Sequence, residues 1–256
     1  MLISVVLPVY NECNRLAACV DRLREYLVKH FSSFEIIIAE DGSTDNSHAI
    51  ARQIADKYGN VRLLHSDKRL GRGTSLTKAI KRSRGNRIIY MDVDLATDIG
   101  YTGKLIEGLE SGASVVTGSR LMDGSRVKRP ISRDITSRTY NLIVRLLFGS
   151  RLRDHQCGFK AFNKADIIPM IDRVRDNHWF WDTELLVMCQ IAGLKITEFP
   201  VLWVHNGGDG LNASKVKVLK DSFSMGSKLI ELKYRTVMHN LSTDNSESKT
   251  VIRVKH

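Results

Sequence analysis

The stretch Arg87-Ile-Ile-Tyr-Met-Asp-Val-Asp94 decides the fold of this chain. Its first five residues are mainly apolar, with two adjacent isoleucines, which is typical of a β-strand buried on both faces of a sheet. Two carboxylates, Asp92 and Asp94, follow at the point where that strand should end. We therefore predict a strand over 87–91 whose carboxyl end carries acidic groups.

Short β-branched runs separated by helical patterns extend outward from this strand. Between the runs, apolar residues recur at three-to-four spacing with charged residues elsewhere, which is typical of amphipathic helices. Besides 87–91, we expect strands over 2–9, 35–39, 61–65 and 114–117, and helices over 14–30, 45–58, 73–84 and 101–110. This alternation predicts an α/β fold with a mostly parallel sheet flanked by helices, and ligands at the carboxyl ends of the strands.

The pattern changes after residue 120. There we expect, in order, a basic stretch over 126–138, an apolar helix over 140–148, a Cys-Gly-Phe turn at 157–159, a helix near 182–191 and a strand near 196–204. A basic amphipathic helix near 215–235 either lies in an anionic lipid interface or packs on the domain. The polar tail 237–256 is expected to be flexible, which leaves a single domain over 1–236.

The composition indicates a folded protein with an anionic partner. The 256 residues include 39 Lys and Arg and 28 Asp and Glu, a net charge of +11, and 43% are hydrophobic. These values lie near globular averages and exclude a disordered or collagenous chain. The positive charge favours nucleotides, nucleic acid or lipid head groups as partners.

The cysteines and apolar segments indicate a cytoplasmic location. The four cysteines form no CxxC pair, so we expect reduced thiols rather than disulfides or a zinc site. The apolar run over 2–9 has no leading basic residues and is interpreted as a first strand, not a secretory segment. No window reaches the ~20 apolar residues that cross a bilayer, so we expect only peripheral membrane contact.

Asp92 and Asp94 are candidate metal ligands. Carboxylates two positions apart at a strand end can converge, and Mg²⁺ or Mn²⁺ held by them would neutralise a diphosphate. The alternative is an aspartate that caps the next turn. His155, His178 and His205 form no metal-binding pattern, although His205 follows a strand end and could reach such a site.

Two further loops also follow expected strands. Asp41 is placed to accept hydrogen bonds from a base or ribose, whereas Ser43 or Thr44 could simply cap the next helix. The segment 67–74, which contains Arg72, puts two glycines and three basic residues at a helix N-terminus. Such a segment suits a phosphate or nucleotide, but it is also compatible with an ordinary basic turn.

Taken together and in order, four of these segments resemble the family 2 glycosyltransferases with the GT-A fold. They are residues 6–12, 40–45, 71–73 and 92–94. The resemblance continues through 118–120, 133–141, 154–160 and 181–186, which are similar to the polyprenyl-phosphate branch and especially to dolichyl-phosphate β-glucosyltransferases. It covers residues 2 to about 235 and implies a Rossmann-like GT-A domain.

The resemblance implies a role for each matching residue. On the donor side, over about 1–119, the base and ribose would be bound by Pro8, Tyr10, Glu12 and Asp41, the nucleotide sugar also by Arg72, and the metal by Asp92 and Asp94. On the acceptor side, over about 120–236, the acceptor phosphate would be bound by Arg120, Arg133 and Ser137. The catalytic set is Asp92, Asp94, Arg120, Arg133 and Asp182.

The implied activity is an inverting, Mg²⁺- or Mn²⁺-dependent transfer of a hexose from a nucleotide diphosphate sugar to polyprenyl or dolichyl phosphate. Related mannosyltransferases have a glutamine where this chain has Ala96, and this difference favours glucose, with UDP as its carrier. The product would supply lipid-linked sugar for protein glycosylation or cell-envelope glycans. The enzyme would act at an anionic membrane surface, on its cytoplasmic face.

The residues alone leave three alternative functions to consider. A transferase that extends a glycan at a sugar hydroxyl would need a carboxylate base, which Asp154 or Asp182 could provide. A nucleic-acid-binding protein would explain the charge, but no nucleic-acid-binding motif is present, so we expect no such partner. A nucleotidyltransferase would also use carboxylates and Mg²⁺.

Overall fold

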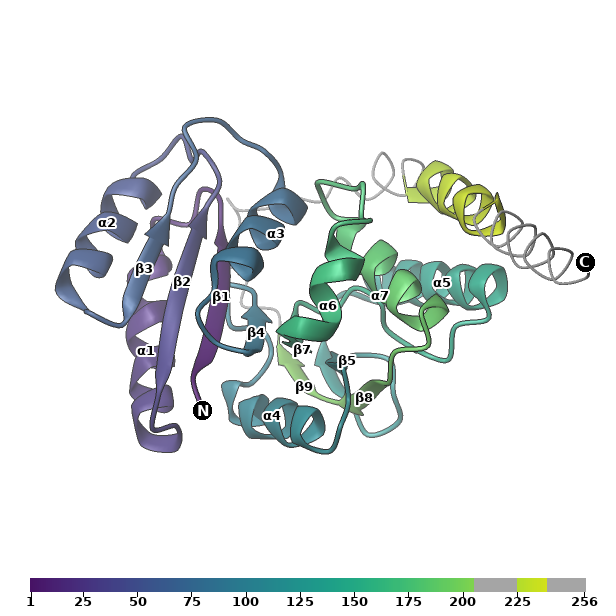
Figure 1. Ribbon diagram of the computed structural model, residues 1–256, viewed down its shortest axis with the longest axis horizontal. Coiled ribbons are helices and arrows are strands. Elements are labelled where there is room, and N and C mark those ends of the chain that lie inside the picture. The colour runs from purple at the N-terminus through teal and green to yellow at the C-terminus, as the bar shows by residue number, and fades with distance from the viewer. Residues whose placement is uncertain (205–224, 239–256) are drawn as a thin grey trace, which may run out of the picture.

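The computed structural model describes residues 1–204 and 225–238, and a seven-stranded sheet forms its centre (Figure 1). The strand order is β3-β2-β1-β4-β7-β5-β8. The strands are β1 Ile3–Val9, β2 Phe34–Glu40, β3 Val61–Leu64, β4 Arg87–Met91, β5 Val115–Ser119, β7 Phe159–Asn163 and β8 Ile196–Pro200. All neighbours pair in parallel except β7, which is antiparallel to β4 and to β5. The predicted single-domain α/β fold is confirmed.

Helices cover both faces of this sheet. They are α1 Leu16–His30, α2 Ser47–Lys57, α3 Arg72–Arg82, α4 Thr102–Glu110, α5 Ile131–Phe148, α6 Lys164–Ile171 and α7 Trp181–Ile191, with a 3₁₀ turn η1 over Ile99–Tyr101. In the core, α1, α2 and α4 share one apolar layer with Val5, whereas α3, α6 and α7 share the other with Val6. Successive residues of β1 thus face opposite layers, which explains its unbroken apolar run.

The sequence did not predict β7; only a turn over 157–159 was expected at its start. Its residues Phe159-Lys-Ala-Phe162 include a lysine that is fully buried, so the apolar run is interrupted in the sequence. The strand inserts between β4 and β5, where Tyr90 lies opposite Lys160. Just before β7, the Gly158 carbonyl accepts a hydrogen bond from the Asp92 N–H at 3.1 Å. The strand therefore joins β4 to β5 within the sheet and lies beside the predicted acidic site.

Two further elements differ from the prediction. Helix α5 begins at Ile131, nine residues before the predicted start at 140. The prediction was late because basic residues on the first turns of the helix interrupt its apolar pattern. The single strand expected over 196–204 is interrupted at Val201, a buried residue between β8 and β9. Strand β9, Leu202–Val204, pairs in parallel with β6, Arg126–Lys128, in a small second sheet. Helix α6 was not expected.

Residues 225–238 form a helix that lies beside α5 at the end of the molecule opposite α2 (Figure 1). Its Leu229 and Leu232 pack with Val144 of α5 and Val187 of α7. The first part of the helix predicted near 215–235, residue His205 and the tail beyond 238 lie outside the described residues. Within the two described ranges, no helix has the length and apolar character needed to cross a membrane.

Candidate active site

A cavity of about 930 Å³ lies at the carboxyl end of β4. Asp92, Arg72 and Asp182 contribute charged groups to it from the sheet, α3 and α7. A second wall comes from α5 and the helix 225–238 and is apolar at Ile143 and Ile230. Basic residues Arg120, Arg129 and Arg133 line the same cavity. One cavity thus contacts both halves of the predicted site.

Arg72 connects Asp92 and Asp182, and these three residues form the charged wall of the cavity. Its Nη1 donates to Asp182 Oδ2 at 2.8 Å and its Nη2 to Asp92 Oδ1 at 2.9 Å, and Nη2 also contacts the Tyr90 hydroxyl. Burial would raise the pKa of Asp182, but the charges of Lys160 and Arg72 hold that pKa below its usual value. Asp182 is therefore a paired carboxylate, which makes it a weak base.

Asp92 and Asp94, the predicted metal ligands, interact electrostatically at the end of β4. Burial and the charge of Asp92 raise the pKa of Asp94 to about 6, and its Oδ1 accepts the Ala96 N–H at 3.1 Å. A Cβ at Gly158 would lie 1.8 Å from Asp92 Oδ2, so a larger residue there would displace this carboxylate from its present position.

These two carboxylates fit a divalent cation that takes its other ligands from a substrate. Among the described residues, no group of three or more His, Cys, Asp or Glu could hold a metal ion by itself. Mg²⁺ commonly binds through one or two carboxylates together with substrate phosphates and water. The donor set of Asp92 and Asp94 suits that arrangement.

The predicted nucleotide residues lie at the ends of β1 and β2. The Asp41 carboxylate accepts the backbone N–H of Leu70 at 2.7 Å and of Gly71 at 2.9 Å, so it also holds the loop before α3. Gly71 has a φ of 101°, a conformation that favours glycine. The Arg69 guanidinium lies over the Tyr10 ring, with its central carbon 4.0 Å from the ring centre.

Two other predicted nucleotide residues differ in their surroundings. Pro8 pairs with Ala39 in the β1–β2 register, so it belongs to the sheet near its carboxyl end. Glu12 forms an ion pair with Arg15 at 3.2 Å, and its N–H donates to Ser47 Oγ. The loop that contains Glu12 is thereby fixed against α2.

The predicted phosphate-binding residues differ in how they are held. Asp154 is fully buried and binds Arg120 twice, with Nε at 2.7 Å and Nη2 at 2.9 Å. Burial would raise the pKa of Asp154, but Arg120 holds it well below its usual range. In contrast, the Arg133 side chain has no hydrogen bond or ion pair within the described part of the chain. One turn later, Ser137 Oγ is buried and also has no partner there.

The histidines do not form a metal site in the described residues. His155 is buried, and its ring lies 2.8 Å from Asn141 Oδ1 and 2.9 Å from Ser150 Oγ. Burial lowers the pKa of His155 to about 4, so the ring is neutral. The His178 N–H donates to Asp176.

Sequence reasoning missed several residues of the site. Tyr90 was expected only as a strand residue and Lys160 was given no role, although they contact Arg72 and Asp182, respectively. Trp179 lies over the Arg72 guanidinium at 4.9 Å from its ring centre. Arg129, which lines the cavity, is ion-paired with Asp134. Only the basic character of 126–138 offered a signal for Arg129.

A sequence profile described as "Glycosyl transferase family 2" matches residues 4–170, about two thirds of the chain. The chain belongs to glycosyl transferase family 2. The family predicted from the loop motifs is thus confirmed. The match includes Asp92, Asp94, the loop before α3 and β7, so Arg72 and Asp92 of the cavity belong to the matched family domain, whereas Asp182 lies beyond it.

Two curated relatives of this family 2 chain are informative. Glycosyltransferase AglD of Haloferax volcanii is 44% identical over 233 residues, covering 89% of this chain and 36% of AglD. The chain therefore spans about a third of the length of that relative. The dolichyl-phosphate beta-glucosyltransferase of Homo sapiens is 30% identical over 248 residues, covering 91% of this chain and 75% of the relative.

A solved structure supports the GT-A fold of this family 2 domain. Glucosyl-3-phosphoglycerate synthase from Mycobacterium tuberculosis, in complex with Mn²⁺, UDP-glucose and phosphoglyceric acid, superimposes with a TM-score of 0.60 at 18% identity. The match covers 91% of this chain and 78% of the synthase.

Proposed function

We propose that this chain transfers glucose, with inversion, from UDP-glucose to the phosphate of a polyprenyl or dolichyl lipid. The observation that carries the proposal is the composition of the cavity of about 930 Å³. It brings together a carboxylate for a metal-bound diphosphate, an arginine that no described residue pairs for a second phosphate, and an apolar wall for a hydrocarbon chain. A water-soluble sugar acceptor would have no use for that apolar wall.

On the donor side, Asp92 and Asp94 would hold Mg²⁺ or Mn²⁺, which supplies charge neutralisation to a leaving diphosphate when bound. Arg72 would orient Asp92 and add positive charge beside the nucleotide sugar. Pro8, Tyr10, Glu12 and Asp41 would then bind the base and ribose, as the family resemblance implies. These residues lie within the proposed donor half, residues 1–119.

On the acceptor side, within the proposed half 120–236, Arg133 and Ser137 have hydrogen-bonding capacity that no described residue uses. A guanidinium and a hydroxyl one turn apart suit a phosphate, to which charge-assisted hydrogen bonds are strong. Arg120 would contribute charge while Asp154 fixes its orientation. The phosphate oxygen would attack the anomeric carbon as the nucleoside diphosphate leaves from the opposite face.

The state of the buried carboxylates favours a phosphate acceptor over a sugar hydroxyl. A phosphate is ionised near neutral pH, whereas a hydroxyl acceptor needs a base. Asp154 and Asp182, the two candidate bases, are each ion-paired, and the pKa of each is held low by its cationic neighbours. Both are therefore poorly suited to remove a proton.

Glucose and UDP are supported by Ala96 and by the relatives. Several curated relatives are dolichyl-phosphate beta-glucosyltransferases, and the solved synthase was crystallised with UDP-glucose and Mn²⁺. The product would be a lipid-linked glucose used in protein glycosylation or envelope glycans.

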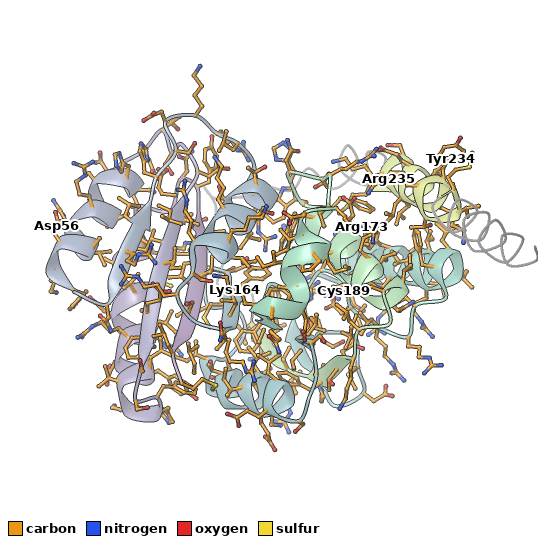
Figure 2. The ribbon with its side chains drawn as sticks, viewed as in Figure 1. Asp56, Lys164, Arg173, Cys189, Tyr234 and Arg235 are labelled. Carbon is orange, nitrogen blue, oxygen red and sulfur yellow. The ribbon has the colours of Figure 1, made fainter. Side chains whose placement is uncertain are left out.

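An anionic membrane, approached from its cytoplasmic face, is the proposed location of the acceptor. Four large apolar residues of α5, Ile131, Ile135, Leu142 and Leu146, are 51–79% exposed. Their spacing puts them on one side of the helix. On the neighbouring helix, Ile230 and Tyr234 are 70% and 63% exposed, and Figure 2 shows Tyr234 directed away from the body of the molecule. Apolar helix faces of this kind can insert into a lipid interface.

The proposal is tested by incubating the purified protein with Mn²⁺, each candidate nucleotide sugar and a short polyprenyl phosphate, and measuring the lipid product by mass spectrometry. We expect hexosyl-phospholipid formation that is fastest with UDP-glucose. Faster glycosylation of a free sugar than of the lipid phosphate would favour the hydroxyl-acceptor alternative.

A further inference from the structure

Lys160 is a buried cation at the centre of the sheet. It lies in β7 opposite Tyr90 of β4, and it is 0% exposed. Its Nζ is 3.0 Å from Asp182 Oδ1 and also contacts the Cys157 carbonyl. It does not line the cavity. A buried lysine requires a compensating charge, and Asp182 provides it.

Lys160 is the first of four groups of alternating charge that end at the cavity. The order is Lys160, Asp182, Arg72 and Asp92, with closest separations of 3.0, 2.8 and 2.9 Å between successive partners. Side-chain exposure is 1%, 3% and 14% for the first three but 43% for Asp92. Only the last member is substantially accessible to solvent.

The difference in exposure determines what happens if Lys160 is lost. Of the four groups, Arg72 would then be the one cation left for two carboxylates. Asp182 is buried, whereas Asp92 is accessible to water. Leaving a buried carboxylate unpaired is much less favourable than leaving an exposed one unpaired. The guanidinium would therefore move toward Asp182 and release Asp92.

We propose that Lys160 is a positioning residue that, by pairing with Asp182, leaves Arg72 free to hold Asp92 in place for the metal–nucleotide complex. The inference rests on the proposed function, because it concerns the same donor site. Residues that orient metal ligands typically change metal affinity by about 10- to 100-fold when they are removed.

The first experiment compares Lys160→Met with Lys164→Met in the intact chain. Lys164 lies at the start of α6 (Figure 2), its Nζ bonds to the Ser83 carbonyl, and it does not line the cavity. Mn²⁺ binding in the presence of UDP is measured by electron paramagnetic resonance. We expect about tenfold weaker Mn²⁺ binding for Lys160→Met, a lower kcat and an unchanged KM for the lipid. Lys164→Met should retain the wild-type Mn²⁺ affinity.

The second experiment separates charge pairing from simple structural support. In the double variant Lys160→Met/Asp182→Asn, both members of the buried pair lose their charge, and Arg72 can again serve Asp92. We expect at least a threefold recovery of Mn²⁺ affinity relative to Lys160→Met. No recovery would show that Lys160 acts through the Cys157 carbonyl or the fold alone, and would overturn the proposal.

Two further variants keep the result interpretable. If Lys160→Met does not fold, as judged by its thermal transition, Lys160→Arg retains the charge and should keep Mn²⁺ affinity within threefold of the wild type. A larger loss in a folded Lys160→Arg protein contradicts charge pairing. Asp92→Asn separates the metal site from the role of Lys160. Unchanged Mn²⁺ binding in that variant refutes the metal site itself, whereas weakened binding there with normal binding in Lys160→Met refutes only the role of Lys160.

Discussion

Arg72 and Arg133 line the same cavity, but the protein holds them in different ways. Arg72, in the proposed donor half, donates to two carboxylates and contacts a tyrosine hydroxyl. Arg133, in the proposed acceptor half, has no side-chain partner within the described residues. Groups that are already paired are preorganised, whereas an unpaired cation is available to a charged ligand. We therefore propose that Arg72 is preorganised on the donor side, whereas Arg133 on the acceptor side gains its partner when the ligand binds.

The apolar residues of the two regions show the same contrast. In β1 and β2, the isoleucines and valines are buried on both faces of the sheet. In α5, large apolar side chains remain exposed along one side. The proposed donor region therefore buries its apolar residues in the core, and we propose that the acceptor region presents its exposed ones to the membrane. The following predictions test this division, from the largest expected effect to the smallest.

Asp94→Ala should reduce glucosyl transfer by on the order of 10³-fold, because the diphosphate charge that develops on departure would lose its compensation. Turnover with UDP-glucose and polyprenyl phosphate measures the effect, and circular dichroism checks the fold. Asp98→Ala is the matched control, since Asp98 caps the 3₁₀ turn through the Gly100 N–H at 2.8 Å and should leave transfer intact. Full turnover in excess chelator would contradict the metal assignment.

Arg133→Ala should lower kcat/KM for the lipid by about 10- to 150-fold, since one charge-assisted hydrogen bond contributes about 1.5–3 kcal/mol. UDP affinity, measured by calorimetry, should stay the same because the lost contact lies on the acceptor side. Arg138→Ala is the control, because Arg138 lies on the same helix but is paired with Asp134. Equal losses in both variants would argue against a specific phosphate contact.

Acid should destabilise the contact between α5 and the turn before β7 through His155. Its pKa is about 4 in the folded protein and about 6.5 when unfolded, so the unfolded chain binds more protons between these values. Stability therefore falls as the pH falls through that window. From pH 6.5 to 5 we expect a decrease of about 1.5 kcal/mol in the free energy of unfolding, measured with urea. His155→Gln should abolish most of this pH dependence.

Leu146→Glu should weaken sedimentation with anionic liposomes about fivefold, because partial burial of a leucine in the interface contributes about 1 kcal/mol. Leu146 is 76% exposed on α5. Val28→Glu is the control, since Val28 is 57% exposed on α1, in the donor region. If both variants bind liposomes like the wild type, the apolar side of α5 does not face the membrane.

The sequence predicted the donor half well because its signals are local. Strand 87–91 was predicted with the bounds that β4 has, since five consecutive residues specify its burial. Helix α5 was predicted only in its second half, and β7 was missed, because charged residues such as Lys160 interrupt their apolar patterns. Where a charge is buried by pairing, local hydrophobicity underestimates the structure.

The sequence by itself determined the α/β class, the family and the two loops that bring Arg72 and Asp92 to the cavity, because these depend on short motifs and on the period of apolar residues. Only the tertiary structure decided which charges are paired and which remain available. Arg72 meets Asp182 across 110 positions of the chain, and Lys160 reaches the same carboxylate from another strand. Electrostatic pairing depends on distance in space, so the local sequence around each residue does not indicate which distant residue will pair with it.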